Sequence, residues 1–268
     1  MIDSPYLVEP GKKFKLSDCK SDDTGKFKHK NDAADDVAKN LEKIDSLQDR
    51  FYAQGKNALL IVLQAMDGGG KDGTIKYVFS GVNPQGCSVT SFKQPTALEL
   101  AHDYLWRIHK AAPPKGMIGI FNRSHYESVL VERVKKLVPE DVWSRRYGQI
   151  NDFEKLLADE GTVIVKFFLN ISYDEQKKRM EKRLADPKKN WKFDPEDLKN
   201  RARWDDYMAA YQDALHKCST KHAPWYAVPS DHKWFRNWVV SDVLVRVLEA
   251  LNPKYPPPLK GAADIRVK

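Results

Sequence analysis

The sequence predicts an α/β fold, a three-layer sandwich in which helices cover both faces of a parallel β-sheet. The first observation is that short apolar runs alternate with amphipathic segments along most of the chain. The second is that the first apolar run, ALLIVLQ at residues 58–64, is uninterrupted, which is typical of a parallel strand buried on both faces. Parallel strands joined through helices need right-handed crossovers, and these place helices on both faces of the sheet.

The first half of the chain is predicted to contain an amphipathic helix followed by strand–helix units. Apolar residues recur at three- and four-residue spacing from Val37 onward, which predicts a helix that begins near Asp32 and stops at Gly55. Thr96 and Glu99 have the spacing of a capping box, which marks the start of another helix. The expected elements are the helix from Asp32, strand 58–64, a helix that includes 75–79, strand 88–92, a helix that contains Tyr104 and Trp106, and strand 117–121.

The second half continues the same alternation. Ser172 and Glu175 have the spacing of a second capping box, here for a helix rich in basic residues. The expected elements are helices 126–138 and 141–159, strand 162–169, the helix after Ser172, helix 198–218, strand 225–228, helix 234–251 and a surface tail over 252–268. Because no internal repeat or linker interrupts this order, residues 1–268 are expected to form a single domain with a lid at about 177–195.

The composition argues against a membrane-spanning or secreted protein. Of the 268 residues, 41% are hydrophobic and 31% charged, and the apolar runs are far shorter than the roughly 20 residues that cross a bilayer. The first residues lack the apolar region of a secretory signal, and three cysteines cannot form a complete disulfide framework. We therefore expect a cytoplasmic protein that does not bind membranes.

The positive charge of the chain is concentrated in one segment. The net charge is +8, and residues 177–192 carry eight basic side chains against two acidic ones. A surplus of this kind favours a polyanionic partner, which could be a nucleic acid, a phosphorylated metabolite or an inorganic chain. The alternative is an ordinary solvated helix face.

The segment directly after the first strand, AMDGGGKDGT at residues 65–74, resembles a P-loop. A glycine-rich turn at a helix N-terminus can point backbone N–H groups at phosphate oxygens. Lys71 follows the last glycine, where it can balance the charge of a transferring phosphoryl group. The expected phosphate-binding residues here are Gly68, Gly69, Gly70, Lys71, Asp72 and Gly73. A glycine-rich turn without a ligand is the alternative.

Two departures from the P-loop pattern suggest that a metal is held differently. Ala65 replaces the first glycine, and Asp72 replaces the hydroxyl residue that binds magnesium. Thr74 cannot substitute, because two residues along a helix correspond to about 200° of rotation. Phosphate would repel the carboxylate of Asp67 unless a divalent cation lay between them, so we expect Asp67 to hold the metal.

A second motif, FNRSHYE at residues 121–127, ends the strand 117–121. The carboxyl ends of neighbouring parallel strands meet at the same site, so this motif is expected beside the P-loop. Asn122 offers an oxygen without charge, and Glu127 is the next carboxylate along the chain, so both are candidate metal ligands. Arg123 is expected to face the phosphates, with a helix-capping or sheet-edge arginine as the alternative, and His125 is expected to pack.

These segments together resemble the polyphosphate kinase type 2 family over nearly all of residues 30–250. The motifs that carry the resemblance are LQAMDGGGKDGT, FNRSHYESVLVERV, RMEKRLADPKKNWKF and APWYAVPSDHKWFRNW. The resemblance implies a P-loop kinase core similar to thymidylate kinase, and catalytic roles for Asp67, Lys71, Arg123 and Arg183. Asn122 followed by HYE resembles the subgroup that phosphorylates both AMP and ADP.

The resemblance implies Mg²⁺-dependent, reversible transfer of the terminal phosphoryl group of polyphosphate to AMP and ADP, with Mn²⁺ as an alternative metal. It also suggests a homo-oligomer and no nucleic-acid partner. Arg179 and Arg183 lie one helical turn apart, so both can reach an anion across the cleft. Lys188, Lys189 and Lys192 are expected to attract or hold the long polyphosphate anion. The alternatives are an ATP-dependent nucleoside or nucleotide kinase and a non-catalytic protein that binds polyanions or nucleic acid.

Overall fold

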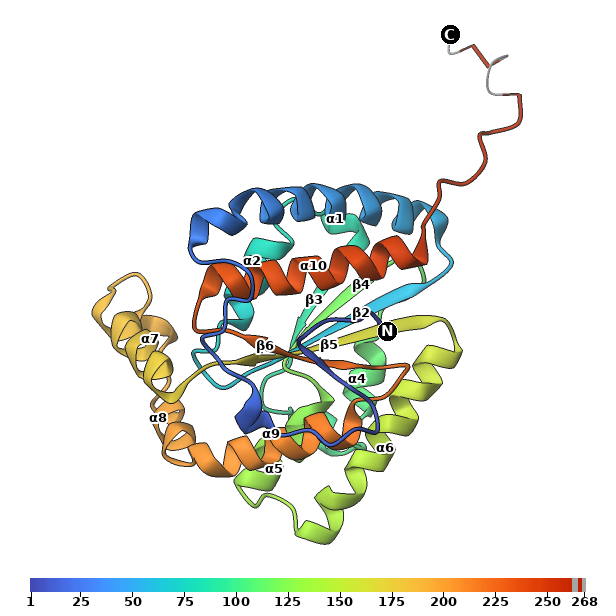
Figure 1. Cartoon of the computed structure of the whole chain (residues 1–268). Helices are drawn as coiled ribbons and strands as arrows, with labels where there is room; N and C mark the ends of the chain where they lie inside the picture. Colours follow the sequence, from blue (N-terminus) through green and yellow to red (C-terminus); the bar gives the residue numbers. More distant parts are fainter. Residues whose placement is uncertain (262–264, 267–268) are drawn as a thin grey trace.

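The centre of the molecule is one six-stranded sheet with the strand order β1-β6-β5-β2-β4-β3 (Figure 1). The computed structural model describes residues 1–261 and 265–266. All neighbouring strands run parallel except β1 and β6, which pair antiparallel. The strands are β1 Leu7–Val8, β2 Ala58–Gln64, β3 Cys87–Ser91, β4 Ile118–Asn122, β5 Thr162–Asn170 and β6 Trp225–Pro229.

Helices cover both faces of this sheet and enclose two apolar cores. One core lies between the sheet and helices α1, α2 and α10, and the other between the sheet and α4, α5, α6 and α9 (Figure 1). The α-helices are α1 Ala34–Gln54, α2 Lys71–Val78, α3 Ala97–Leu100, α4 Trp106–Ala111, α5 Val131–Val134, α6 Glu140–Asp159, α7 Tyr173–Ala185, α8 Pro195–Ala202, α9 Trp204–Cys218 and α10 Lys233–Leu251. Short 3₁₀ helices span Leu16–Asp18, Lys30–Ala33, Pro84–Gly86, His125–Val129 and Asn190–Lys192. The predicted three-layer α/β sandwich is confirmed.

Strand β2 determines where the glycine-rich loop lies, at the carboxyl ends of the strands. All seven of its residues are buried, because β4 and β5 pair with it on either side and helices cover both faces. Gly55 has a left-handed conformation (φ 61°) and ends α1 just before this strand, as the sequence predicts. The strand therefore delivers the following glycine-rich loop to a fixed position at the carboxyl edge of the sheet.

Two of the helices predicted before residue 140 are shorter or more irregular than expected. Thr96 and Glu99 form the predicted capping box, but α3 ends at Leu100, and Tyr104 lies in the turn before α4. Asp103 is the reason, because its carboxylate accepts from the Leu105 N–H at 2.9 Å and starts a new turn. The predicted helix 126–138 is a 3₁₀ helix followed by α5, and the left-handed Lys136 (φ 55°) stops it early.

Differences in the second half concern helix starts and one break. The predicted helix 198–218 is two helices, α8 and α9, separated at Arg203, whose backbone is not helical (φ −107°, ψ 31°). Ser172 caps α7, but the capping box is incomplete: its N–H donates to Asp231 instead, and Glu175 pairs with Arg179. Strand β1 was not predicted, since two residues carry too little periodicity.

The predicted tail begins where α10 ends at Leu251, and residues 252–261 contain no helix or strand. Residues 262–264 and 267–268 of the predicted tail lie outside the described residues. Among the helices in the described part of the chain, none combines the length and apolarity that a membrane span requires.

Candidate active site

The two sequence motifs meet at the carboxyl edge of the sheet. The glycine-rich loop 65–70 connects β2 to α2, and Arg123 follows β4, the parallel neighbour of β2. The Arg123 N–H donates to the Leu63 carbonyl at 3.1 Å, which ties the end of β4 to β2. The predicted convergence of the two motifs is therefore observed.

The loop has the backbone conformations that only glycine adopts readily. Gly68 (φ 79°) and Gly70 (φ 103°) are left-handed, and Gly70 precedes the first residue of α2. A Cβ atom at Gly69 would lie 2.9 Å from the Met66 carbonyl oxygen. The Gly69 N–H donates to that same carbonyl at 3.0 Å, so it serves the turn itself. Asp72 and Gly73 lie in the first turn of α2.

Lys71 lies beneath the loop instead of extending into solvent. Its side chain is buried, and its Nζ donates to the Ala65 carbonyl at 2.8 Å, which closes the loop. Burial and the positive charge of Arg123 lower the pKa of Lys71, and the carboxylates of Asp67 and Glu127 oppose this shift. The amine is thus held at the start of α2, where the helix dipole and free N–H groups favour an anion.

Asp67 is the electrostatic centre of the site. Its Oδ1 accepts from Arg123 at 2.8 Å, and its Oδ2 accepts from the Asn200 amide at 2.9 Å. Burial raises the pKa of Asp67, but the charges of Lys71 and Arg123 outweigh burial and hold the pKa below its usual value. The carboxyl group is therefore ionised at neutral pH and can hold a cation.

Arg123 has a backbone conformation that is costly for a residue with a side chain. Its φ of 63° lies in the left-handed region, which costs on the order of 1–3 kcal/mol when the surroundings enforce it. Burial lowers the pKa of Arg123, but the charges of Glu127 and Asp67 outweigh burial and raise it above its usual value, so the guanidinium stays charged. Of its guanidinium nitrogens, only Nη2 has an acceptor among the described residues. The left-handed backbone thus places the charged Arg123 guanidinium, which has donors without acceptors in the described residues, next to the loop.

Helices α7 and α8 lie next to each other at one side of the molecule (Figure 1), and side chains from both contact the loop. Gln176 of α7 donates to the Asp67 carbonyl at 2.7 Å, and Arg179 donates to the carbonyls of Gly68 and Gly69 at 3.2 and 3.1 Å. Arg183, one turn further, pairs with Asp197 of α8 at 3.2 Å. Arg179 thus contacts the loop directly, whereas Arg183 is held by α8.

Lys188, Lys189 and Lys192 are not brought to the loop. All three are exposed in the segment between α7 and α8. The Lys189 amine pairs with Asp186 at 2.6 Å, and the Lys192 amine lies 5.0 Å from the ring centre of Trp191, which is 73% exposed. These residues can attract an anion from solvent, but the structure does not bring them into contact with Asp67 or Lys71.

The three predicted metal ligands lie at the same edge without forming a closed cage. The described residues hold no group of three or more histidine, cysteine, aspartate or glutamate side chains placed to bind a metal. Asn122 donates to Asp72 at 2.7 Å, and Glu127 is near enough for its charge to affect Lys71 and Arg123. Mg²⁺ is commonly held by one or two carboxylates together with water and substrate phosphates, so this donor set fits a metal that binds with a phosphate.

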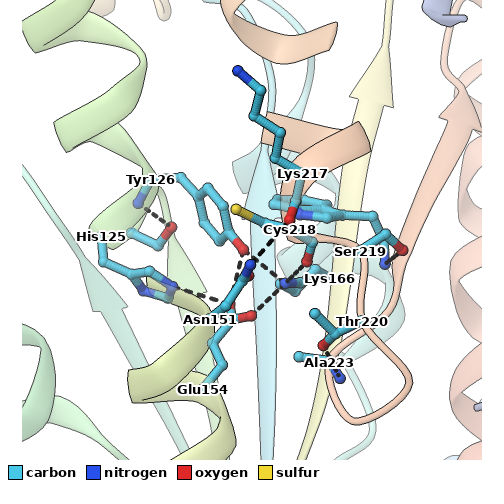
Figure 2. Close-up of polar contacts among 12 residues, drawn as sticks. His125, Tyr126, Asn151, Glu154, Lys166, Lys217, Cys218, Ser219, Thr220 and Ala223 are labelled. Atoms are coloured by element: carbon cyan, nitrogen blue, oxygen red, sulfur yellow. Dashed lines mark hydrogen bonds and ion pairs between the residues drawn. The ribbon is translucent and has the colours of Figure 1, made fainter. Parts of the chain in front are cut away.

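His125 and Tyr126 anchor the second motif in the protein interior, as Figure 2 shows. His125 is buried and lies 3.1 Å from Glu154, and the Tyr126 hydroxyl donates to the same carboxylate at 3.0 Å. Glu154 also pairs with Lys166 at 2.5 Å. Burial lowers the pKa of His125 and keeps it neutral, so its expected packing role is confirmed.

A cavity of about 310 Å³ lies beside the second motif. Ser124, His125, Glu127 and Ser128 form one wall, and the segment from Pro95 to Ile108 supplies much of the rest, including Arg107. This volume is at the lower end of the range typical of small-molecule sites. The cavity therefore offers space for a ligand next to Glu127.

Several residues of the site lie outside the two motifs that meet at the loop and had no predicted role. Asn200 and Gln176 both hold Asp67, and Asp197 holds Arg183. Arg236, at the start of α10, lies against Gly70. All four come from distant segments, and only the helical periodicity of their surroundings could have suggested that their side chains face inward.

Comparison with known proteins gives concordant matches. Residues 27–256 match the family model described as Polyphosphate kinase 2 (PPK2). The AMP/ADP-polyphosphate phosphotransferase of Meiothermus ruber is 52% identical over 264 residues, which cover 98% of this chain and 99% of that protein. The ADP-polyphosphate phosphotransferase of Rhodopseudomonas palustris is 47% identical over 228 residues, covering 81% and 79%.

Solved structures agree with this match. The crystal structure of Polyphosphate Kinase 2 from Arthrobacter aurescens TC1 is similar with a TM-score of 0.89 and 40% sequence identity. The similarity covers 99% of this chain and 96% of that one. The fold of the described residues is thus that of a P-loop kinase.

Proposed function

The chain belongs to the polyphosphate kinase 2 family, and on this premise we propose that it is a polyphosphate:nucleotide phosphotransferase that converts AMP to ADP and ADP to ATP. The terminal phosphoryl group of inorganic polyphosphate is the group transferred, and the reaction is reversible. The acceptor range is supported by the relative from Meiothermus ruber, whose name covers both AMP and ADP.

The single observation that carries this proposal is the junction of Asp67, Lys71 and Arg123. Two cations and one ionised carboxylate face one another at the glycine-rich loop, and Arg123 donates to Asp67 at 2.8 Å. Phosphoryl transfer needs little covalent chemistry from a protein, so catalysis depends on positioning and on charges that match the transferring group. In the proposed reaction Lys71 and Arg123 bind the phosphoryl oxygens, so that the phosphorus lies in line between the attacking oxygen of the acceptor and the leaving oxygen of the donor.

We propose Mg²⁺, with Mn²⁺ as an alternative, as the required metal. Asp67 and Glu127 would supply carboxylate oxygens, and the side-chain oxygen of Asn122 would supply a neutral ligand. When bound, the metal would neutralise charge on the phosphates. The carboxylate of Asp67, kept ionised by Lys71 and Arg123, is suited to hold a cation near these phosphates.

Arg183 is proposed to act from the lid, taken as about residues 177–195. It lies on α7 with Arg179, which donates hydrogen bonds to the loop carbonyls. Release from Asp197 would free the Arg183 guanidinium to stabilise charge on the transferring group. The exposed Lys188, Lys189 and Lys192 would attract the long anion, an effect that salt screens.

The cavity beside Glu127 is the proposed acceptor pocket. It adjoins the motif that carries Arg123, and Arg107 on its wall supplies a positive charge that suits a nucleotide phosphate. We further propose a single domain, a surface tail over 252–268, a cytoplasmic location, assembly as a homo-oligomer, and no nucleic-acid or membrane partner.

The experiment is a donor test. The protein is incubated with Mg²⁺, polyphosphate and either AMP or ADP, without added ATP, and nucleotides are separated by chromatography. ADP and then ATP should form from AMP, and ATP from ADP. If no product forms with either acceptor, while ATP phosphorylates AMP or a nucleoside, the proposal is wrong and the protein is an ATP-dependent kinase.

A further inference from the structure

Arg236 is a buried arginine that has no acidic partner among the described residues. It lies near the start of α10, and only 2% of it is exposed. Its Nε and Nη2 donate to the side-chain oxygen of the neighbouring Asn237 at 3.2 and 2.9 Å. In the described part of the chain, Nη1 donates to no acceptor. A buried cation is expensive unless an anion pairs with it.

The free end of Arg236 points at the phosphate-binding loop. A Cβ atom at Gly70 would collide with Arg236 Nη1 and lie 3.2 Å from its Cζ, and a Cβ atom at Gly73 would lie 3.6 Å from Nη2. Gly70 is the residue before α2, an eight-residue helix whose N-terminal amides favour anions. The guanidinium therefore lies against the place where this helix end would meet a phosphate.

The neighbouring Arg179 has no donor to spare. Its five N–H groups donate to Glu175 and to the carbonyls of Gly68, Gly69, Ser230 and Asp231. Arg179 is thus a positioning residue that holds the loop. Burial and the charge of Arg179 lower the pKa of Arg236 to about 9, so it remains protonated at neutral pH.

Further basic side chains lie between Arg236 and the surface of the molecule. Lys233 lies one helical turn before Arg236 on α10, and Lys182 lies one turn after Arg179 on α7. Arg179 donates to the carbonyls of Ser230 and Asp231, just before α10, and burial and these neighbouring charges lower the pKa of Lys233. Lys182 and Lys233 are exposed. Glu175, the acidic neighbour that opposes this shift, is already paired with Arg179. Charge therefore favours an anion that leads from Gly70 past Arg236 to the surface.

We propose that Arg236 is a donor-binding residue whose Nη1 donates to a phosphate of the polyphosphate chain beside Gly70, with Lys233 and Lys182 binding the following phosphates. This inference rests on the proposed function for the identity of the donor. The chemistry it needs is a phosphate linked by phosphoanhydride bonds, which tripolyphosphate and ATP both contain.

The test compares Arg236→Gln with Arg246→Gln, an exposed arginine on the same helix that pairs with Asp242 at 3.7 Å. Binding of tripolyphosphate and of ATP, each with Mg²⁺, is measured by calorimetry, and the unfolding temperature is measured without ligand. Arg236→Gln should weaken tripolyphosphate binding about 10- to 100-fold, the range expected for a charge-assisted hydrogen bond. Arg246→Gln should change it by less than about two-fold.

The ligand-free unfolding temperature separates binding from structure. Arg236→Gln should leave it unchanged or raise it, because a buried unpaired charge is removed. If Arg236→Gln does not fold, Arg236→Lys is tested in its place. Lysine keeps the positive charge but lacks the planar guanidinium with its several N–H donors, so this variant should fold and bind tripolyphosphate more weakly than the wild type.

Unchanged tripolyphosphate binding in Arg236→Gln, or a wild-type protein that does not bind tripolyphosphate, would overturn the proposal. Weakening of ATP binding alone would also overturn it, because the subsite would then belong to the nucleotide. Failure of the proposed function is distinguishable: wild-type protein would bind tripolyphosphate in an Arg236-dependent way and yet transfer no phosphoryl group to AMP or ADP.

Discussion

Replacing Lys166 with methionine should destabilise the protein strongly, because Lys166 is a charged residue in the middle of a buried strand. It lies in β5 and is fully buried, as are Glu154 and Tyr126. Its amine donates to Glu154 at 2.5 Å, to the Tyr126 hydroxyl at 2.7 Å and to the Cys218 carbonyl at 2.7 Å, as Figure 2 shows. Burial raises the pKa of Glu154, but Lys166 and His125 outweigh burial and lower it, so the carboxyl group of Glu154 is ionised at neutral pH.

The magnitude follows from what the substitution leaves behind. Methionine preserves most of the packing, but Glu154 then lacks a cationic partner, which costs about 3–5 kcal/mol in a buried pair. The orphaned Cys218 carbonyl adds about 1–3 kcal/mol. Because Glu154 keeps its contacts with His125 and Tyr126, we expect a loss near the lower part of this sum, about 4–6 kcal/mol. Net stabilities of domains are about 5–15 kcal/mol, so the effect is large.

The assay is urea denaturation followed by circular dichroism. Lys155→Met is the matched control, because Lys155 lies next to Glu154 on α6 in an exposed pair with Asp159, and its loss should cost less than about 0.5 kcal/mol. Adding Glu154→Gln to Lys166→Met should restore part of the stability, since the uncompensated charge is removed. A Lys166→Met variant within about 1 kcal/mol of the wild type would refute this reasoning.

The same variant should show a characteristic pH dependence. Without Lys166, burial raises the pKa of Glu154 in the folded state above its value in the unfolded state. Because the pKa of Glu154 is then higher in the folded state, protonation of Glu154 stabilises the folded state fully at pH values below the pKa of the unfolded state. This stabilisation is lost as pH rises through the pKa of the folded state. The destabilisation should therefore shrink as pH falls from about 8 to about 5, and a loss that is independent of pH would contradict an uncompensated Glu154.

Three further predictions concern turnover. Lys71→Met and Asp67→Asn should each lower kcat at least about 100-fold with unchanged circular dichroism, and loss of folding instead would make these residues structural. Arg183→Gln should lower kcat more than it raises KM for polyphosphate in steady-state assays, whereas the reverse would indicate ground-state binding. Asn122→Asp should lower the Mg²⁺ concentration that gives half-maximal rate, because it adds a carboxylate beside the proposed metal; no change would place Asn122 outside the coordination sphere.

Most of the sheet could be predicted because its strands are local patterns. The run at 58–64 and the left-handed Gly55 before it depend only on neighbouring residues. The interruption at Arg203 could not be predicted, because a long-range contact accompanies it. Arg203 breaks the helix predicted over 198–218 and donates to the Val134 carbonyl at 2.8 Å, a residue far away in the sequence. The incomplete capping box at Ser172 has the same cause, since Asp231 takes its N–H.

The candidate site divides in the same way. Asp67 and Arg123 stand in motifs that follow strands, so the order of strands alone predicts that they meet. Asn200 stands outside every motif, and Arg236 lies in the last motif without a predicted role, so only tertiary packing brings them to the loop. Lys166 contradicts the apolar pattern of its strand, and its partner Glu154 on α6 explains the exception only once the fold is known.

The most direct test of the account is a crystal structure of the protein with tripolyphosphate and Mg²⁺. The account predicts an anion at the loop between Gly68 and Lys71, with Arg123 directed at one of its phosphates and the metal beside Asp67. If the loop held no anion and tripolyphosphate bound only at other surfaces of the molecule, the central claim would be contradicted.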